Sequence, residues 1–329
     1  MEKRVLITVS GECPYIPEMR KILADKGIET KQADLKNLSE EGLIAQAADC
    51  TSAITGPEFW TKKVFDNLPQ FRCIIKSGVG LDAIDLDAAT KHGVAIANTP
   101  GQNAGAVAEM ACALILSSLR RIIFCNDWVH GQKRESIHNT IYSHELSSLT
   151  VGLVGFGNIA RQVAKMLSGF GCRFIACDVQ PDYGAAEKLN VKICSFEEVI
   201  TQSDIVSLHV PLTQETKYLI NKDTLAKMKK SAILVNTCRG GVIHEADLYQ
   251  ALKGHGIQWA ALDVTEIEPL PKESPLLALD NIQFTPHTAT ATYEAMRNLY
   301  FTCAKQTIQF YEGNLIENLI NPDYIKFVE

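Results

Sequence analysis

Long apolar runs and a strong net charge are both missing from this sequence of 329 residues. No stretch approaches the length that a helix needs to cross a bilayer. The apolar run at the start is short, so we expect a first strand there and no signal peptide. The net charge of −6 gives no electrostatic reason to expect nucleic acid or an anionic membrane as a partner.

Paired cysteines and several common catalytic motifs are also missing. The ten cysteines are scattered and form no Cys-x-x-Cys pair. Several lie in apolar strand or helix patterns, where a thiol acts as a small hydrophobic group, so we expect reduced thiols and a cytoplasmic protein. No pair of residues has zinc-ligand spacing, so we expect no metal. The sequence has no Gly-x-Ser-x-Gly and no Walker loop, which excludes two further classes of site.

What the sequence does contain is a dinucleotide-binding pattern between Thr150 and Asp178. An apolar strand, Val151–Val154, leads into the turn Gly155-Phe156-Gly157, and a helix with apolar residues on one face follows. A second apolar strand, Phe174–Cys177, then ends at the acid Asp178. Strand, glycines, helix, second strand and terminal acid in this order are much more specific than the glycines alone.

Each part of this pattern has a physical role. Gly155 allows a tight turn, and Gly157 lacks the Cβ that would hold the backbone away from a pyrophosphate. Ala160 lets the helix pack close to the strand, and the N–H groups at the helix start face the phosphates. Asp178 can accept hydrogen bonds from a ribose diol and would repel a 2′-phosphate, so we predict NAD rather than NADP. A plain βαβ unit would explain the fold but not the acid.

Short apolar strands alternate with helices along most of the chain, which predicts α/β domains with parallel sheets. We predict a discontinuous substrate domain, residues 1–100 and 290–329, and an NAD-binding domain, residues 101–289. The strands expected in the first part are Val5–Val9, Ala53–Thr55, Cys73–Lys76 and Val94–Ala97, and the helices are Glu18–Lys26, Ser39–Gln46 and Leu86–Lys91. After Asp178 we expect strands Ile205–Val210, Ala232–Asn236, Trp259–Val264 and Ile282–Phe284, and helices Lys222–Met228 and Glu245–Leu252. A ligand cleft is expected between the two domains, at the ends of the parallel strands.

Two long helices would connect these domains. The first, from Ala104 to about Leu119, is apolar nearly all round, so we expect it to be buried between the domains. The second, Tyr293–Tyr311, would carry the chain back to the first domain. Residues 121–149 are more polar and irregular; they could form a helix and an arm over a neighbouring subunit, or an ordinary surface loop.

Three polar residues, Arg239, Glu268 and His287, lie just after predicted strands. Reduction of a 2-oxo acid by a hydride donor needs a guanidinium to hold the carboxylate, a proton donor, and a carboxylate to orient that donor. In principle these residues fill the roles of carboxylate holder, orienting acid and proton donor, respectively. Singly, each also suits a solvent-exposed or packing role, and their spacing alone does not bring them together.

The chain from about Cys73 to His287 resembles the D-isomer-specific 2-hydroxyacid dehydrogenases, and most of all the 3-phosphoglycerate dehydrogenase group. Ordered motifs carry this resemblance: Lys76–Asp82, Asn98–Asn103, Ala106–Glu109, the glycine turn, His209–Thr213, Asn236–Gly240, Leu262–Pro269 and Pro286-His287. The resemblance implies a flavodoxin-like substrate domain and a Rossmann domain.

The resemblance also implies site residues and an assembly. The catalytic residues would be Arg239, Glu268 and His287, and the substrate loop would be Ser77, Gly78 and Val79 with Arg239. The NAD contacts implied, besides Gly155 and Gly157, are Asn158, Ile159, Asp178, Val210, Pro211, Thr237, Cys238 and Asp263, the last at the nicotinamide amide. The family usually forms homodimers through the cofactor domain, which favours the arm interpretation of residues 121–149.

The chain departs from the family pattern at three places. Ala83 stands where Asn is common, Lys76 where Arg is frequent, and Thr288-Ala289-Thr290 follows His287 where Ile-Gly-Gly is common. These changes border the implied substrate and nicotinamide sites and leave the identity of the substrate open. The regulatory domain of longer phosphoglycerate dehydrogenases is not in this sequence, so serine feedback through it is not expected.

The leading hypothesis is an NAD-dependent oxidoreductase of small D-2-hydroxy and 2-oxo acids, with D-3-phosphoglycerate among the candidates. Lys76 is a candidate for binding a phosphate, although it equally suits a solvent-exposed lysine. A second hypothesis is an NAD-sensing protein like the C-terminal-binding co-repressors, which keep the same three polar residues. A third is a formate or phosphite dehydrogenase, but formate enzymes of this fold have Gln where Glu268 stands.

Overall fold

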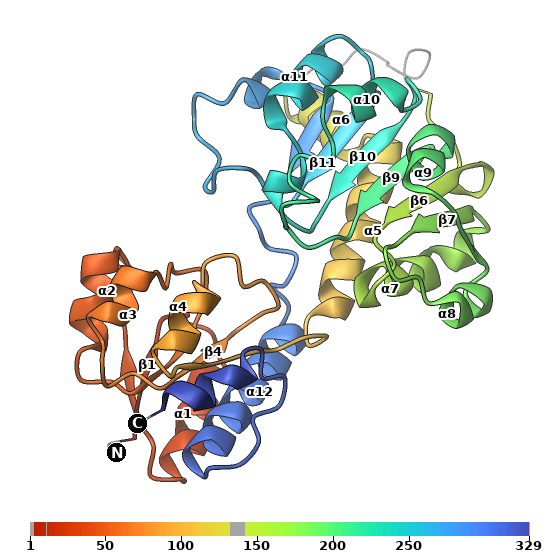
Figure 1. The fold of residues 1–329 in the computed structure, drawn as a ribbon. Helices are drawn as coiled ribbons and strands as arrows, with labels where there is room; N and C mark the ends of the chain where they lie inside the picture. Colours follow the sequence, from red (N-terminus) through yellow and green to blue (C-terminus); the bar gives the residue numbers. More distant parts are fainter. Residues whose placement is uncertain (1–2, 11, 132–141, 329) are drawn as a thin grey trace. The chain divides into compact units, whose positions relative to one another are not determined.

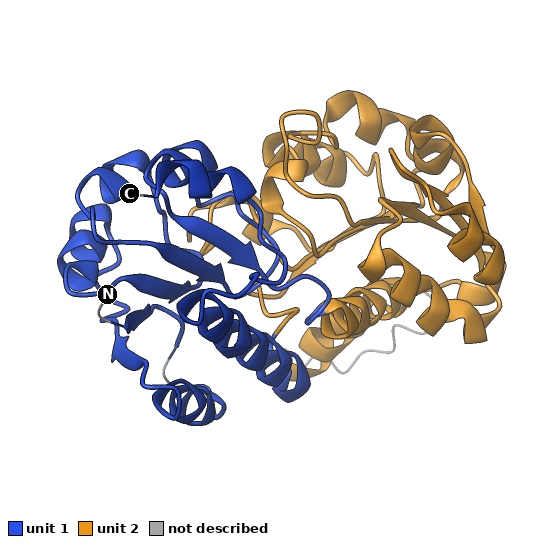
Figure 2. Cartoon of the chain, turned by 60° about the horizontal axis from the view of Figure 1, so that its bottom comes forward, with its two compact units in different colours: residues 1–103, 291–329 blue, residues 104–290 orange. Residues whose placement is uncertain are grey.

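The computed structural model of the protein describes residues 3–10, 12–131 and 142–328. Within it the chain forms two compact units (Figure 2). Unit 1 comprises Met1–Asn103 and Ala291–Glu329, and unit 2 comprises Ala104–Thr290. Unit 1 is therefore built from two segments that are distant in the sequence, with the whole of unit 2 inserted between them.

Unit 1 is built on a five-stranded parallel sheet with the order β2-β1-β3-β4-β5 (Figure 1). Its strands are β1 (Arg4–Ile7), β2 (Glu29–Gln32), β3 (Ser52–Thr55), β4 (Cys73–Lys76) and β5 (Ala95–Asn98). Its helices are α1 (Ile16–Ala24), α2 (Glu40–Ala47), α3 (Lys62–Asp66), α4 (Leu86–Lys91) and α12 (Tyr293–Tyr311), with a short 3-10 turn at Pro322–Phe327. This strand order is that of flavodoxin-like sheets.

Both faces of the unit 1 sheet are covered, which is why its strands are apolar throughout rather than alternating. Leu6 belongs to the core on one face, and Val5 and Ile7 belong to the core on the other. The returning helix α12 packs on α1 and β4. Its buried Gln306 donates to the carbonyl oxygen of Asn98 at 2.8 Å, which fixes the end of β5.

Unit 2 is built on a seven-stranded parallel sheet with the order β12-β11-β10-β9-β6-β7-β8. Its strands are β6 (Thr150–Val154), β7 (Arg173–Cys177), β8 (Val191–Ile193), β9 (Ile205–Leu208), β10 (Ile233–Asn236), β11 (Trp259–Leu262) and β12 (Ile282–Phe284). Its helices are α5 (Ala104–Arg120), α6 (Ile122–His130), α7 (Asn158–Leu167), α8 (Tyr183–Lys188), α9 (Phe196–Gln202), α10 (Lys222–Lys227) and α11 (Glu245–Lys253), and 3-10 turns lie at Leu146–Ser148, Ser168–Phe170, Gly240–Val242 and Pro275–Ala278. The order reverses beside β6, as in a Rossmann sheet.

The predicted fold class, two α/β domains with parallel sheets, is confirmed. Several element predictions need correction. The first strand ends at Ile7 and does not reach Val9, and the strand expected at Ile205–Val210 ends at Leu208. Five elements that are short or polar were not predicted from the sequence: β2, β8, α3, α8 and α9. Helix α5 packs on α7, β10 and β11 within unit 2.

None of the helices in the described residues is both long and apolar enough to span a membrane. Part of the predicted arm, residues 132–141, lies outside the described residues. The helical part of that prediction, α6, is present, and none of its residues is buried.

Candidate active site

The turn Gly155-Phe156-Gly157 joins β6 to α7 at the carboxyl edge of the unit 2 sheet. Gly155 has φ +89°, and a Cβ there would lie 2.6 Å from the carbonyl oxygen of His209, so only glycine fits. At Gly157 a Cβ would meet no atom within 4 Å, and no side chain caps the start of α7. Open space beside uncapped N–H groups is what an approaching pyrophosphate requires, and the predicted contacts Asn158 and Ile159 lie in that first turn.

Asp178 follows β7 and faces the glycine turn. Its Oδ2 accepts a hydrogen bond from the Phe156 N–H at 2.7 Å, and its Oδ1 accepts one from the Gln180 N–H at 2.8 Å. A carboxylate can accept about four hydrogen bonds, so capacity remains for a ribose diol. Val179, next in the chain, is fully exposed and brings no cation to this place. The residues of the turn and Asp178 therefore fit NAD.

The next predicted cofactor residues lie on the same edge of the sheet. Val210 and Pro211 follow β9, and Thr237 and Cys238 follow β10, which pairs with β9 in parallel. The Thr237 side-chain oxygen is buried and has no hydrogen-bond partner in the part of the chain that the structure describes. A buried, unpartnered hydroxyl at this edge fits a polar group of a ligand. Burial raises the pKa of the Cys238 thiol to about 11, so this thiol stays protonated and carries no charge.

Arg239 extends from a tight loop after β10 that Asn236 holds together. The Asn236 amide donates to the Arg239 carbonyl oxygen at 2.9 Å, and its Oδ1 accepts from the Cys238 N–H at 3.0 Å. The guanidinium itself donates to the Cys238 carbonyl oxygen at 2.7 Å. Asn236 is fully buried, so this brace is shielded from water. The loop places the Arg239 side chain at the carboxyl edge, where it is partly exposed.

His287 and Glu268 form a hydrogen-bonded pair. The His287 Nδ1 lies 2.6 Å from the Glu268 Oε2, and the Glu268 Oε1 accepts from the Thr265 N–H at 3.1 Å. Because a carboxylate is only an acceptor, Nδ1 carries the proton and Nε2 is left to give or take another. The two side chains are 50% and 36% exposed, respectively, so a substrate can reach the imidazole. The pairing expected from the sequence is thus present in the structure.

The turn that carries His287 is held by Asp263, which is 2% exposed. The Asp263 carboxylate accepts from the Thr285 hydroxyl at 2.5 Å and from the Thr288 and Ala289 N–H groups at 3.0 and 3.1 Å. His287 has φ +52°, a left-handed conformation that costs energy outside glycine, and these bonds maintain it. This bracing role of Asp263 was not predicted from the sequence, and its contact with the nicotinamide amide stays a prediction.

Strand register brings the three polar residues to one edge of the unit 2 sheet. Asn236 pairs with Leu262, and Leu262 pairs with Phe284, so β10, β11 and β12 end level with one another. Arg239 and His287 each lie three residues beyond their strands, and Glu268 is tied to His287. The arrangement can hold an anion and transfer a proton on the same sheet edge as the glycine turn.

The predicted substrate loop lies in unit 1, after β4. The Ser77 N–H donates to the Thr55 carbonyl oxygen at 2.9 Å, and the Gly78 N–H donates to the Thr99 hydroxyl at 2.7 Å. Gly78 has φ +125°, a backbone conformation that side chains rarely adopt. Val79 is 47% exposed at the tip of the loop. The loop therefore presents an apolar side chain and main-chain groups at the edge of the unit 1 sheet.

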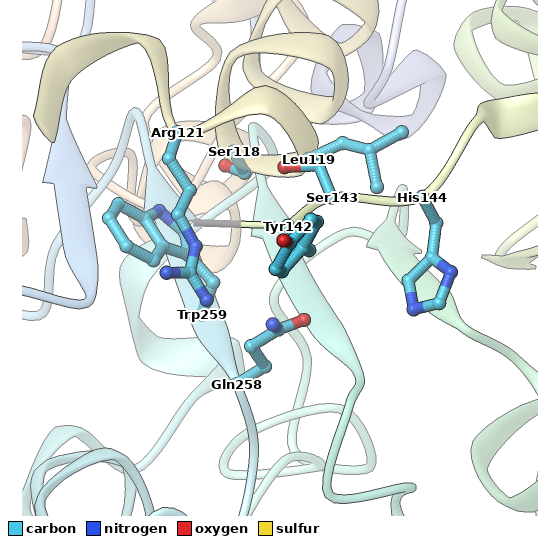
Figure 3. A pocket seen from close by; sticks show the side chains of 8 residues that line it. All are labelled: Ser118, Leu119, Arg121, Tyr142, Ser143, His144, Gln258 and Trp259. Carbon is cyan, nitrogen blue, oxygen red and sulfur yellow. The ribbon is translucent and has the colours of Figure 1, made fainter. Parts of the chain in front are cut away.

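A small pocket lies elsewhere in unit 2, at the opposite end of β11 (Figure 3). Figure 3 shows its lining residues, Ser118, Leu119, Arg121, Tyr142, Ser143, His144, Gln258 and Trp259. Gln258 and Trp259 stand at the start of β11, whereas Asp263 and Glu268 follow its end. This pocket is therefore separate from the edge that carries the candidate catalytic residues. Among the described residues no group of three or more His, Cys, Asp or Glu could hold a metal ion.

Comparison with known proteins adds independent evidence. The family model described as the NAD-binding domain of the D-isomer specific 2-hydroxyacid dehydrogenases matches residues 112–289, more than half of the chain. A glyoxylate reductase of Korarchaeum cryptofilum is 36% identical over 293 residues, 88% of each chain. A D-3-phosphoglycerate dehydrogenase of Bacillus subtilis is 37% identical over 261 residues, 79% of this chain but 49% of that protein. The structure of an Aquifex aeolicus D-lactate dehydrogenase complexed with NAD and lactic acid is similar at a TM-score of 0.85, with 26% identity over 97% of this chain and 99% of that one.

These likenesses agree with the geometry of unit 2, where an NAD-binding turn and a histidine–carboxylate pair share one sheet edge. The protein is an NAD-dependent oxidoreductase that transfers a hydride between the cofactor and 2-hydroxy or 2-oxo acids. The chain belongs to the D-isomer-specific 2-hydroxyacid dehydrogenase family.

Proposed function

We propose that Arg239, Glu268 and His287 are the catalytic residues of this dehydrogenase, and that the substrate is a small D-2-hydroxy acid or its 2-oxo acid. The observation that carries the proposal is the 2.6 Å contact between the His287 Nδ1 and the Glu268 Oε2. A histidine fixed in this way presents Nε2 in a defined orientation, as a general acid requires. Bound NADH supplies the hydride for reduction of the oxo carbon.

Each residue then has a defined step. The Arg239 guanidinium binds the substrate carboxylate in a planar fork and polarises the adjacent carbonyl. The His287 Nε2 donates a proton to the carbonyl oxygen as it becomes a hydroxyl, and Glu268 stabilises the imidazolium beforehand. In oxidation, neutral His287 accepts the hydroxyl proton. The predicted substrate-loop residues, Ser77, Gly78 and Val79, would contribute main-chain groups to binding of the acid.

The cofactor residues belong to the same proposal. Gly155, Gly157, Asn158 and Ile159 would hold the pyrophosphate, and Asp178 would hold the adenosine ribose. The remaining cofactor contacts proposed are Val210, Pro211, Thr237, Cys238 and Asp263.

The substrate proposed is unphosphorylated, on the grounds of the charges in unit 1. The loop region after β3 contains the carboxylate of Glu58, which is 6% exposed and accepts from the Thr55 hydroxyl at 2.7 Å. Thr55, which donates to Glu58, pairs in the sheet with Lys76, the cation considered above for a phosphate. The Lys76 ammonium donates to the Ser77 carbonyl oxygen at 3.3 Å. A carboxylate on the neighbouring strand disfavours a further anion at this end of the sheet.

A substrate panel tests the proposed function. The purified protein is mixed with NADH or NADPH and with glyoxylate, pyruvate or hydroxypyruvate, and oxidation of the cofactor is followed by absorbance. D-3-phosphoglycerate and D-lactate are tested with NAD in the reverse direction. We expect turnover of an unphosphorylated acid with NADH. A clear preference for D-3-phosphoglycerate would refute the substrate proposed, and tight NADH binding without turnover of any acid would favour a sensor instead.

We also propose a cytoplasmic homodimer that associates through unit 2. The support is helix α6, which has no buried residue although Ile122, Ile123 and Val129 lie on it. Such exposed apolar side chains favour burial against another chain. Light scattering after gel filtration should give a dimer, and the double substitution Ile123→Glu and Val129→Glu should give a monomer. A monomeric wild-type protein would refute the assembly.

The cytoplasmic location is supported by the cysteines. All ten thiols are free, which suits a reducing compartment. Disulfide bonds in the protein isolated from its native source would argue against this location.

A further inference from the structure

Two reciprocal hydrogen bonds join the start of α11 to the loop that carries Glu268. The Glu245 N–H donates to the Glu266 Oε1 at 2.6 Å, and the Glu266 N–H donates to the Glu245 Oε1 at 2.5 Å. Each glutamate thus binds the main chain of the other. We call this pair the Glu245–Glu266 clasp.

A third segment is tied to the same clasp. The Tyr218 hydroxyl donates to the second carboxylate oxygen of Glu266 at 2.9 Å, and the Tyr218 N–H donates to the Gly241 carbonyl oxygen at 2.9 Å. The hydrogen bond to Glu266 and its negative charge raise the pKa of Tyr218. The Glu266 carboxylate therefore receives one donor on each oxygen, and Tyr218 links the clasp to the loop that follows Arg239.

The loops of Arg239 and Glu268 are also in direct backbone contact. A Cβ at Gly240 would lie 2.0 Å from both the carbonyl carbon and the carbonyl oxygen of Thr265. The residue after Arg239 is therefore pressed against the loop that leads to Glu268. A shift of residues 265–268 would therefore displace both the Arg239 and the Glu268 side chains.

Gathering carboxylates at this place is unfavourable in itself. Burial raises the pKa of Glu245, and the negative charges of Glu266 and Glu268 raise it further. The hydrogen bond from the Glu266 N–H acts in the opposite direction. The Glu245 carboxyl group is half-buried. Like charges kept close at a cost usually serve a purpose at a functional site.

We propose that Glu245 is a positioning residue for the dehydrogenase reaction. Its carboxylate fixes the Glu266 N–H, and this holds the following residues so that Glu268 meets the His287 Nδ1 in the correct orientation. The chain of contacts is short, because Thr265 and Glu268 are themselves bonded at 3.1 Å and Glu268 and His287 at 2.6 Å. The proposal rests on the proposed role of His287 as the proton donor.

Three substitutions test this role against a matched control. Glu245→Gln keeps an oxygen that can accept from the Glu266 N–H, whereas Glu245→Ala removes it. Glu245→Met keeps the length of the side chain without an acceptor and serves if the alanine variant does not fold. The control is Asp247→Ala in the same helical turn, since Asp247 accepts from the Lys222 N–H at 2.9 Å and pairs with His244 at 2.8 Å.

The kinetic result expected is a loss in kcat rather than in substrate binding. Misplacing a catalytic group by a fraction of an ångström to 1 Å costs about tenfold to 100-fold. Glu245→Ala and Glu245→Met should therefore lower kcat by about tenfold or more, with little change in KM. Glu245→Gln and Asp247→Ala should stay close to the wild-type kcat. An equal loss in Asp247→Ala would overturn the proposal, because general damage to α11 would then explain the effect.

A second measurement does not need turnover. In protein labelled with ¹⁵N-histidine, the two imidazole nitrogens of His287 are assigned by comparison with His287→Gln. Glu245→Ala should change their shifts toward those of an imidazole with a free Nδ1–H, and Glu245→Gln should not. An unchanged His287 spectrum in Glu245→Ala would overturn the positioning role. Failure of the wild-type protein to reduce any 2-oxo acid would defeat the proposed function, while this spectrum would still decide whether Glu245 positions Glu268.

Discussion

The carboxyl edges of the two parallel sheets are organised in different ways. In unit 1, one oxygen of the buried Glu58 carboxylate, Oε2, accepts from the Thr8 and Thr55 hydroxyls, each at 2.7 Å, and from the Gly56 N–H at 2.8 Å. The side chains that protrude nearby are apolar: Val79 is 47% exposed and Phe59 is 66% exposed. In unit 2, Asp263 and Asn236 are the buried braces, and the side chains that they help to present are charged or ionisable.

Under the proposed function, this difference would separate recognition from chemistry. The unit 1 edge offers main-chain groups, exposed apolar side chains and Lys76, which would select a ligand by shape, charge and hydrogen bonding. The unit 2 edge offers a guanidinium and an imidazole in fixed positions, which can stabilise charge and move a proton. Substitutions at the unit 1 edge should therefore change which acid is used, whereas substitutions at the unit 2 edge should change whether the reaction proceeds.

The largest effect is expected at Arg239. Arg239→Ala should lower kcat/KM for the preferred acid, because a charge partner of the substrate is lost. The expected loss of transition-state stabilisation is about 3–5 kcal/mol. Arg239→Lys keeps the charge without the planar fork, so its kcat/KM should lie between those of the wild type and Arg239→Ala. Steady-state kinetics, with NADH binding followed by fluorescence as a control, measure this. A loss of less than about tenfold would contradict the role.

The next effect concerns a buried histidine at the same edge. Burial lowers the pKa of His209 from 6.5 to about 4, and neither ring nitrogen has a hydrogen-bond partner among the described residues. The unfolded chain binds a proton below about pH 6.5 that the folded protein does not bind until about pH 4, so stability falls as the pH is lowered through this window. His209 alone should lower the free energy of unfolding by about 3 kcal/mol across this pH window.

The measurement is the free energy of unfolding by urea at several pH values for the wild type and His209→Asn. The wild type should lose more stability than the variant between pH 7 and pH 4, because asparagine does not titrate. Parallel curves for the two proteins would show that His209 is charged or solvated in the folded state.

A smaller effect is expected on the cofactor. Asp178→Ala removes the proposed ribose acceptor and should weaken NAD binding by about 1.5–3 kcal/mol, the value of hydrogen bonds to a charged group. NADP should be affected less, since the carboxylate would repel its phosphate. Titration of both cofactors by calorimetry gives the comparison. Equal weakening of the two would remove the ribose assignment.

The smallest effect on stability is expected in unit 1. Phe59→Ala and Val79→Ala change exposed side chains, so the free energy of unfolding should move by no more than about 0.5 kcal/mol. The ratio of the kcat/KM values for glyoxylate and a larger 2-oxo acid should nevertheless change, by a factor that corresponds to about 1 kcal/mol. An unchanged ratio together with a large loss of stability would reverse the proposed division between the two edges.

Several strongly patterned elements, short and long, were predicted well from the sequence. Cys73–Lys76, Leu86–Lys91 and Tyr293–Tyr311 have the predicted bounds. Helix α4 begins where Asp85 accepts from the Ala88 N–H, a local signal that can be read from the residues. The capping box of α9, Ser195 and Glu198, was an equally clear signal that the sequence analysis overlooked. The polar strand β2 had no such signal, because an edge strand need not bury both faces.

For the candidate site, the candidate catalytic residues could be predicted from the sequence, but the hydrogen bonds that hold their loops in place could not. The pairing of His287 with Glu268 followed from the chemistry that a proton donor needs. The Glu245–Glu266 clasp could not be predicted, because it joins the main chain of residues 21 positions apart through a loop whose path no pattern specifies. The bracing role of Asp263 was missed for the same reason: a buried acid after a strand can serve a ligand or its own chain.

The bond between Asp178 and the Phe156 N–H has a consequence for cofactor engineering. The carboxylate that would exclude NADP also satisfies a main-chain donor of the glycine turn, at 2.7 Å. Replacing it with a side chain that has no hydrogen-bond acceptor, such as lysine or alanine, would leave that donor unpaired, at a cost of about 1–3 kcal/mol. A change of cofactor preference therefore needs a substitute acceptor for the turn, such as Asp178→Ser, as well as a new cation for the phosphate.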